Sequence, residues 1–211
     1  GDFDILRKKF EEFEKTFFII SIILFSTCLL LVNGFVEIYT TGVNDIEYYQ
    51  PIFAAVIVLA NLIYCVREPY RLLVLSAGKF KETNMSSIVE ALLNIIISVL
   101  LVSRWELAGI AIGTLIAVTY RMLSFIWYLK NDVLLFKYAR YVKMFLMLVG
   151  IVALNLYLYA SHPFVIGIFG QFFAFGTATV VGETALTFLI YKICIFCQKT
   201  IQRIHITGGK K

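Results

Sequence analysis

Charged residues and histidine are scarce in this chain. Asp, Glu, Lys and Arg form 16% of its 211 residues, whereas a soluble domain contains about 25%. Only two histidines occur, His162 and His205, and neither has a metal-ligating or nucleophilic partner in the sequence. The chain also lacks the glycine-rich phosphate-binding loops, the GxSxG elbow and the HExxH motif. We therefore expect no catalytic residues, no metal site and no enzymatic activity.

Cysteine is also rare. The four cysteines, Cys28, Cys65, Cys194 and Cys197, lie in or beside apolar runs, so no pair indicates an extracellular disulfide framework. Cys194 and Cys197 have the CxxC spacing of metal and redox sites, but no further cysteine or histidine stands near them to complete a ligand set. We interpret this pair as small apolar residues.

Hydrophobic residues are abundant, at 60% of the chain, and they form six long runs. Crossing a bilayer takes about 20 helical residues at about 1.5 Å each. The runs lie near residues 17–36, 51–76, 86–103, 107–129, 141–160 and 164–191. They predict an all-α, polytopic membrane protein with a six-helix transmembrane lobe over residues 17–196. Residues 1–16 form a predicted amphipathic interfacial helix, and residues 197–211 form a cytoplasmic basic tail. Pro69, inside the second run, predicts a kink because it has no N–H to donate.

The loop charges predict the orientation in the membrane. Nearly all Lys and Arg residues outside the runs fall on one side, and Arg104 stands alone on the other. Because positively charged loops stay in the cytoplasm, both termini should be cytoplasmic. The formal net charge of +5 follows from this arrangement, so we expect no nucleic-acid partner.

Polar side chains form stripes on three of the predicted helices. The second run places five of them within about 120° of its surface: Asn61, Tyr64, Arg67, Glu68 and Arg71. One side of the third run carries Ser87, Glu90, Asn94 and Ser98. One side of the fourth carries Gly113, Ala117, Arg121, Ser124 and Tyr128. At membrane depth such stripes should face protein or water rather than lipid. Close helix contact is also predicted, from small residues at every fourth position: Gly109, Gly113 and Ala117.

Four charged side chains, Arg67, Arg71, Glu90 and Arg121, fall at similar depth in the predicted cytoplasmic third of the bilayer. A guanidinium stays charged and can donate two parallel hydrogen bonds to a phosphate. One interpretation is a water-filled cavity, open to the cytoplasm, whose arginines bind a diphosphate headgroup. The other is that the arginines reach toward the interface and pair with Glu68 and Glu90. The candidate headgroup contacts are Arg67, Arg71, Arg121, Asn61, Tyr64 and Asn94.

Three glutamates are candidates for ion coupling or for structural pairing: Glu68, Glu90 and Glu183. Glu90 can act as a protonatable coupling site or as the partner of an arginine, and pairing is the preferred interpretation. Glu183 stands nearly alone in the sixth run, and a lone acidic residue at membrane depth is a functional candidate by default.

The stretch from Gly78 to Arg121 carries a family resemblance. Its GKFKET turn, its IVEALLNIIISVLLV helix and its GIAIGTLIA helix resemble the C-terminal half of the polysaccharide (oligosaccharide-lipid) flippases. The superfamily of these proteins also contains the multidrug and toxin exporters. The segments FVEIYTTGVNDIEYYQP and REPYRLLVLSAGKF fit as well, so the resemblance spans roughly residues 7–132.

This resemblance implies one six-helix lobe of a two-lobe flippase, in which the lobes rock around a central cavity. The implied substrate is an oligosaccharide on a polyprenyl diphosphate, moved across the cytoplasmic (inner) membrane by alternating access for polysaccharide export. The implied partners are this lipid-linked oligosaccharide, membrane lipids and an N-terminal six-helix half. A proton or sodium gradient would drive transport, with no bound cofactor. Because the chain starts with Gly1 rather than Met, we expect a fragment that does not transport alone.

Three alternatives stay open. A multidrug or toxin exporter of the same fold would favour an acidic, aromatic cavity for cationic drugs, whereas arginines outnumber the acid in the second run. A membrane-embedded glycosyl- or acyltransferase would need a His or Asp constellation at the membrane surface, and the sequence offers none. A non-transporting scaffold subunit would turn its polar stripes toward a partner and exclude water.

Overall fold

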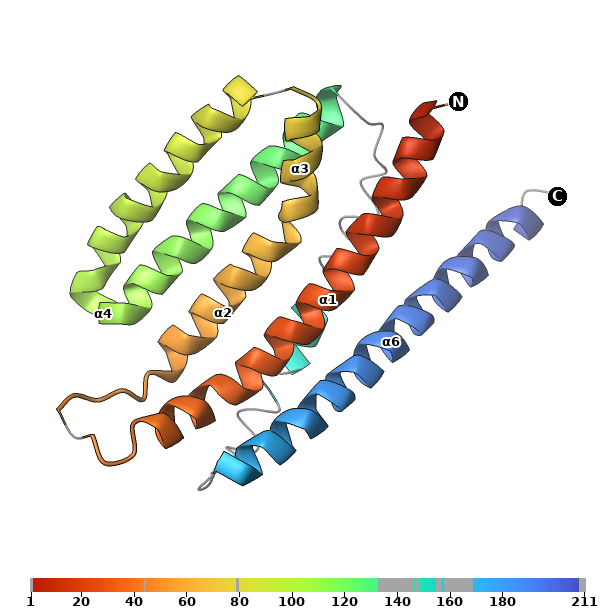
Figure 1. The fold of residues 1–211 in the computed structure, drawn as a ribbon. Coiled ribbons are helices and arrows are strands. Elements are labelled where there is room, and N and C mark those ends of the chain that lie inside the picture. Colours follow the sequence, from red (N-terminus) through yellow and green to blue (C-terminus); the bar gives the residue numbers. More distant parts are fainter. Residues whose placement is uncertain are drawn as a thin grey trace.

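Helices make up the regular structure of the protein. The computed structural model describes residues 2–43, 45–78, 80–132, 146, 149–154, 157 and 169–208, and no strand occurs within them. The helices are α1 (Asp2–Tyr39), α2 (Pro51–Val66), α3 (Glu68–Ser76), α4 (Phe80–Asp132) and α6 (Phe169–Gly208) (Figure 1). The all-α prediction is therefore confirmed for the described part of the chain.

Three helical segments are long and apolar enough to cross a membrane: Ile5–Tyr39, Pro51–Ser76 and Thr83–Leu129. They contain 35, 26 and 47 residues. At about 1.5 Å per residue each one exceeds the hydrocarbon thickness of about 30 Å. A shorter apolar helix, Ala174–Ile190, lies within α6. The helices therefore have the lengths and composition of a membrane protein.

Helix α1 is continuous over two segments that were predicted as separate elements from the sequence. The predicted interfacial helix at 1–16 and the predicted span at 17–36 form one helix from Asp2 to Tyr39. Ion pairs on its surface, Arg7 with Glu11 and Lys9 with Glu12, follow helical spacing near its start. The placement of residues 1–16 in the headgroup plane stays a prediction.

The second predicted span breaks where its proline requires. Helix α2 ends at Val66, and α3 begins at Glu68 with Pro69 in its first turn. Arg67 stands between them, and its carbonyl oxygen accepts hydrogen bonds from the backbone N–H groups of Tyr70 and Arg71, both at 3.1 Å. Proline cannot continue the regular ladder because it lacks an N–H. The predicted kink is confirmed, and it places Arg67 at the junction.

Helix α4 is a hairpin of two arms. Glu106 has φ 47° and ψ −126°, outside the helical region, so the chain reverses there. In Figure 1 the first arm (residues 80–105), called the rising arm here, runs from the top of the view down to this turn, and the returning arm (residues 107–132) runs back up beside it. A Cβ added at Gly113 would lie 2.3 Å from Ser98 Oγ, and one at Gly109 would lie 2.6 Å from the backbone carbonyl of Leu101. The close contact predicted from these small residues is confirmed.

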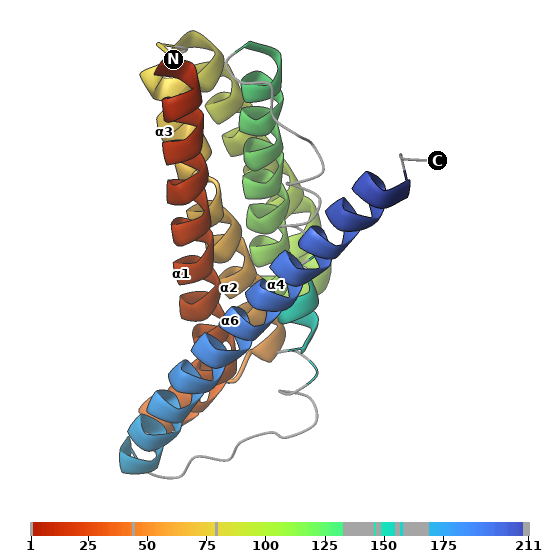
Figure 2. The ribbon, with the colours of Figure 1, turned by 90° about the vertical axis from the view of Figure 1, so that its right-hand side faces the viewer.

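The helices pack in an order that leaves α4 and α6 at opposite sides. Helix α4 packs against α2 and α3, α1 packs against α2, and α6 packs against α1. Helices α1 and α6 are antiparallel: Phe35, near the end of α1, meets Phe172, near the start of α6, with 5.8 Å between ring centroids, whereas Ile190 packs against the cluster that contains Phe18 and Ile22. Figure 2 shows α6 crossing α1 obliquely.

Two core clusters hold this arrangement together. The first joins α1, α3 and the returning arm through Phe10, Tyr70, Leu73, Val74, Phe125 and Leu129. The second joins α1, α2 and part of the predicted fifth span through Phe18, Ile22, Leu62, Val66 and Ile151. Burial of apolar surface therefore fixes the α2–α3 junction between α1 and α4.

The last two predicted spans are only partly described. Within the fifth, at 141–160, the described residues are 146, 149–154 and 157, all helical. The sixth, at 164–191, falls largely within α6, which continues to Gly208 through most of the predicted tail at 197–211. His162 lies outside the described residues, and so do the side chains of Cys194, Cys197 and His205. The six-helix count therefore stays a prediction.

Candidate functional site

One carboxylate lies between two buried guanidinium groups at the centre of the helical packing. Glu90 Oε1 accepts a hydrogen bond of 2.5 Å from Arg67 Nη1, and Glu90 Oε2 lies 3.6 Å from Arg121 Nη1. The arginine side chains are 7% and 6% exposed, whereas that of Glu90 is 23% exposed. We call these three residues the ion cluster. It combines the α2–α3 junction with both arms of α4.

The backbone explains why these three meet. Arg67, with φ −75° and ψ −18°, joins α2 to α3 directly before Pro69, so its side chain lies at the junction. Glu90 and Arg121 come from opposite arms of the α4 hairpin, whose separation is set by Gly109 and Gly113. Because the two arms are close together, Glu90 on the rising arm can reach Arg121 on the returning arm.

Aromatic rings support both guanidinium groups. The guanidinium carbon of Arg67 lies 4.1 Å from the ring centroid of Tyr64, and that of Arg121 lies 4.8 Å from the ring centroid of Phe125. Cation–π contact of this kind favours a fixed guanidinium plane. The arginines are therefore held from two sides, by a ring and by Glu90.

The ion cluster has more donors than acceptors. Arg67 Nε, Arg121 Nε and Arg121 Nη1 are buried and find no hydrogen-bond acceptor in the described part of the protein. The 3.6 Å separation from Glu90 Oε2 exceeds hydrogen-bond length. A buried donor without an acceptor is costly, and one carboxylate balances only one of two positive charges. The cluster therefore carries one uncompensated positive charge together with unsatisfied donors.

Arg71 does not join the ion cluster. Its Nε donates to both oxygens of Glu68, at 2.9 and 2.8 Å, and its Nη2 donates to Oε1 at 2.6 Å. The two residues are three positions apart on α3, and both are partly exposed. Of the four charges predicted to share one layer, the structure brings three together and pairs Arg71 with Glu68.

The other predicted headgroup contacts occupy different surroundings. Asn61 is exposed, and its Nδ2 donates to the carbonyl of Ile57 on its own helix at 2.8 Å. Tyr64 is half-exposed beside Arg67. Asn94 Oδ1 accepts from Ser98 Oγ at 3.2 Å and from Thr114 Oγ1 at 3.3 Å, so it joins the two arms of α4. The stripe on the rising arm faces protein at this level.

Glu183 lies apart from the ion cluster. It is buried on α6, and Thr187, one turn further on, is buried as well. Helix α6 packs chiefly against α1 rather than α4. Within the described residues no group of three or more His, Cys, Asp or Glu side chains could hold a metal ion.

A second buried carboxylate was missed from the sequence. Glu14 is 2% exposed, and Tyr70 Oη donates a hydrogen bond of 2.5 Å to its Oε1. The pair joins α1 to α3 inside the first core cluster. A helical register could have found it, because Glu14 lies four residues from both Phe10 and Phe18, which are buried.

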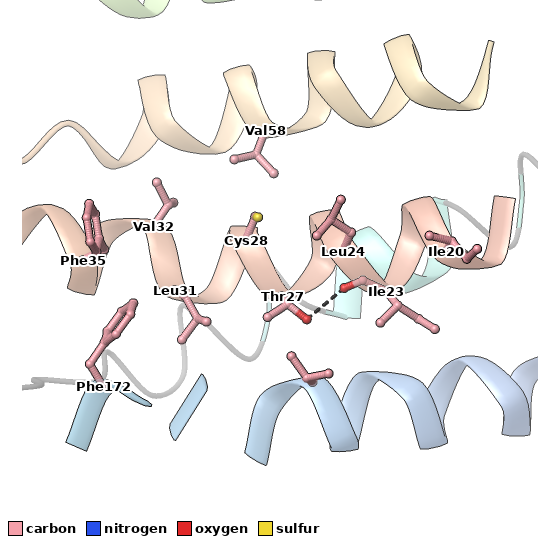
Figure 3. Close-up of a pocket in the computed structure, with 11 residues that line it drawn as sticks. Ile20, Ile23, Leu24, Thr27, Cys28, Leu31, Val32, Phe35, Val58 and Phe172 are labelled. Carbon is pink, nitrogen blue, oxygen red and sulfur yellow. Dashed lines mark hydrogen bonds between the residues drawn. The ribbon is translucent and has the colours of Figure 1, made fainter. Parts of the chain in front are cut away.

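An apolar groove is lined by residues of α1, α2 and α6 and includes none of the ion cluster (Figure 3). Its volume is about 640 Å³. The lining includes Leu24, Cys28, Val58 and Phe172, and the hydroxyl of Thr27 is turned to the carbonyl of Ile23 at 2.8 Å. This groove offers contact with hydrocarbon and no polar chemistry.

No family model, curated protein or solved structure matches the chain. Function is therefore argued from the ion cluster and from the helices that hold it.

Proposed function

We propose that this chain is one lobe of a membrane transporter that flips a polyprenyl-diphosphate-linked oligosaccharide across the cytoplasmic membrane. Transport would proceed by alternating access and serve polysaccharide export. The observation that carries the proposal is the pair of buried guanidinium groups, Arg67 and Arg121, which share one carboxylate and retain donors without an acceptor. No covalent chemistry is required of the protein.

A diphosphate fits this excess of positive charge. It offers several oxygen acceptors and at least one negative charge, and the planar fork of arginine can bind two of those oxygens at once. A cationic drug would instead meet two guanidinium groups against one carboxylate. The arrangement therefore favours an anionic headgroup over the substrates of a multidrug exporter.

The depth of the ion cluster supports a site reached from the cytoplasm. Glu90 lies seven residues after Thr83, Arg121 eight before Leu129, and Arg67 nine before Ser76, where these spans end. At about 1.5 Å per residue these separations are about 10 to 14 Å. In the proposed protein all three charges would therefore lie between one end of the spans and the bilayer midplane. By the distribution of Lys and Arg this end is cytoplasmic.

The lobe would act together with a second six-helix half. The rising arm of α4 exposes a row of large apolar residues: Leu92, Ile95, Ile96, Val99 and Leu100. In the proposed protein they face lipid or the second half, and the partly exposed Glu90 faces the cavity between the two. A gradient of protons or sodium would drive the cycle.

A non-transporting scaffold is the second candidate. The pairing of Arg71 with Glu68 favours it, because this pair already satisfies itself within one helix. Substituting cysteine for Arg67, Arg71 or Arg121 separates the two functions in a full-length protein whose native cysteines are replaced. A transporter predicts that a membrane-impermeant thiol reagent reacts at 67 and 121 from the cytoplasmic side and that lipid-linked oligosaccharide blocks the reaction. A scaffold predicts no reaction at either position.

The direct test is flipping in reconstituted vesicles. A fluorescent polyprenyl-diphosphate oligosaccharide is placed with the full-length protein, and its transfer is followed by quenching from an impermeant reductant. Arg67→Gln and Arg121→Gln should abolish protein-dependent transfer. Arg104→Gln is the matched control, because Arg104 is exposed beside the α4 turn. Equal transfer by all three variants would refute the proposed role of the ion cluster.

A further inference from the structure

We propose that Glu90 is a built-in competitor, whose carboxylate occupies the position that a substrate phosphate takes between Arg67 and Arg121. This inference rests on the proposed function and adds a residue that regulates the site. In the present structure the two oxygens of Glu90 each face a different arginine, at 2.5 and 3.6 Å. Two oxygens of one phosphate can bridge two guanidinium groups in the same way.

The three residues differ in how firmly they are held. Arg67 and Arg121 are almost fully buried, and each lies over an aromatic ring. Glu90 is three to four times more exposed than either, on a rising arm whose surface is mostly exposed. The arginines therefore form a fixed pair, whereas the carboxylate can turn out toward the open side. Displacement of Glu90 requires no movement of the two cations.

Glu90 is also an incomplete partner. It forms one hydrogen bond with Arg67, and it stays beyond hydrogen-bond reach of Arg121, whose Nε and Nη1 are left without acceptors among the described residues. A phosphate has more oxygens and can satisfy both arginines. A phosphate can displace the Glu90 carboxylate only if it binds the two arginines more strongly than Glu90 does. The unsatisfied donors of Arg121 can bind phosphate oxygens, so they favour the phosphate over Glu90.

Displacement would change the contacts between helices. The hydrogen bond from Arg67 to Glu90 joins the α2–α3 junction to the rising arm of α4, over 23 residues of chain. When a phosphate replaces the carboxylate, that hydrogen bond is lost and the rising arm has one connection fewer to the junction. Substrate binding is thereby linked to a movement of one helix relative to another, which alternating access requires.

The test measures the binding of geranylgeranyl diphosphate and of inorganic pyrophosphate to the purified full-length protein in lipid nanodiscs. Glu90→Gln should bind the diphosphate lipid at least about tenfold more tightly than the natural protein, equivalent to about 1.4 kcal/mol. Arg67→Gln and Arg121→Gln should weaken binding at least about tenfold, also when combined with Glu90→Gln. Glu12→Gln, which removes a similar charge from the exposed pair with Lys9 on α1, should leave the affinity unchanged.

A second variant covers the event that Glu90→Gln does not fold. Glu90→Asp keeps the charge but withdraws the carboxylate by one methylene, so it should bind the diphosphate lipid more tightly than the natural protein, by a smaller factor. A ligand-dependent rise in the unfolding temperature of each variant verifies that the folded protein is measured.

The outcomes separate this inference from the proposed function. If the natural protein binds and the Glu90 variants bind equally or less tightly, Glu90 is a structural partner and the competitor role is wrong. If neither the natural protein nor the Glu90 variants bind either probe, both the inference and the anionic-substrate proposal are wrong. If the Glu90 variants gain the same factor in affinity for pyrophosphate and for the diphosphate lipid, the headgroup alone displaces Glu90. If they gain affinity for the lipid only, the isoprenoid chain of the ligand is needed for entry.

Discussion

Tyr70 donates a 2.5 Å hydrogen bond to the carboxylate of Glu14, across 56 residues of sequence and inside the first core cluster. Both side chains are at most 2% exposed. The contact fixes the start of α1 against α3, directly beyond the junction that carries Arg67. Because Phe10 also meets the ring of Tyr70 edge-on, with 6.1 Å between centroids, a polar and an aromatic contact act at the same place.

Removing the Tyr70 hydroxyl should destabilise the protein. Tyr70→Phe keeps the ring and deletes only the donor to a buried carboxylate, and a hydrogen bond to a charged group contributes about 1.5–3 kcal/mol. We expect a loss in that range, measured by unfolding in detergent. Tyr39→Phe is the matched control, since Tyr39 is strongly exposed. In a double-mutant cycle with Glu14→Gln, additive losses would show that the two groups are not coupled.

The α4 hairpin yields a prediction about glycine. Gly109→Ala should lower the stability by about 1–3 kcal/mol, as overpacking does, because its Cβ would lie 2.6 Å from backbone atoms of Leu101 that cannot move aside. Gly182→Ala is the control: no described residue has an atom within 4 Å of that Cβ, and alanine is about 1 kcal/mol better than glycine in a helix. Thermal unfolding of both variants measures the contrast. Equal effects would mean that the arms are not in close contact.

Part of this arrangement could be predicted from the sequence because its causes are local. Pro69 lacks a donor, so the helix breaks beside it, and Gly109 and Gly113 lie on one helix face, so a neighbour can approach. The meeting of Arg67, Glu90 and Arg121 follows from equal depth along the spans. Helical periodicity and chain length are sufficient for such inferences.

Other features depend on which of several possible partners each charged side chain takes, and neither depth in the membrane nor helical periodicity decides this. Arg71 was predicted in the same layer as Arg67. Glu68, however, lies one turn from Arg71 on the same helix and accepts three hydrogen bonds from it, so this pair forms without contact between distant parts of the chain. Glu14 has the charge of a surface residue, and its burial is supported by a hydrogen bond from Tyr70, which lies far along the chain. The sequence offered Glu68 and Glu90 as partners of the arginines, but it did not assign each arginine to its own glutamate.

The two arginines of the ion cluster should couple unequally to Glu90. Double-mutant cycles of Arg67 and of Arg121 with Glu90, each with glutamine, should give a larger coupling energy for Arg67, since its contact is 2.5 Å against 3.6 Å. The cycle of Arg71 with Glu68 should give about 0.2–1 kcal/mol, as for exposed pairs, and should weaken with salt. Unfolding free energies in detergent provide all three values. A larger coupling for Arg121 than for Arg67 would contradict the geometry.

The break before Pro69 should matter for the ion cluster although Pro69 itself carries no charge. Pro69→Ala restores a backbone N–H, so the residue can donate to the carbonyl of Cys65 and α2 can continue into α3. Straightening the kink changes the angle between α2 and α3 and so displaces Arg67 relative to Glu90 on α4. We expect the Arg67–Glu90 coupling energy to fall by more than half in the Pro69→Ala background, while the Arg71–Glu68 coupling, which is contained within α3, stays as it was. If both couplings are unchanged, Arg67 reaches Glu90 independently of the break, and the junction has no role in positioning the site.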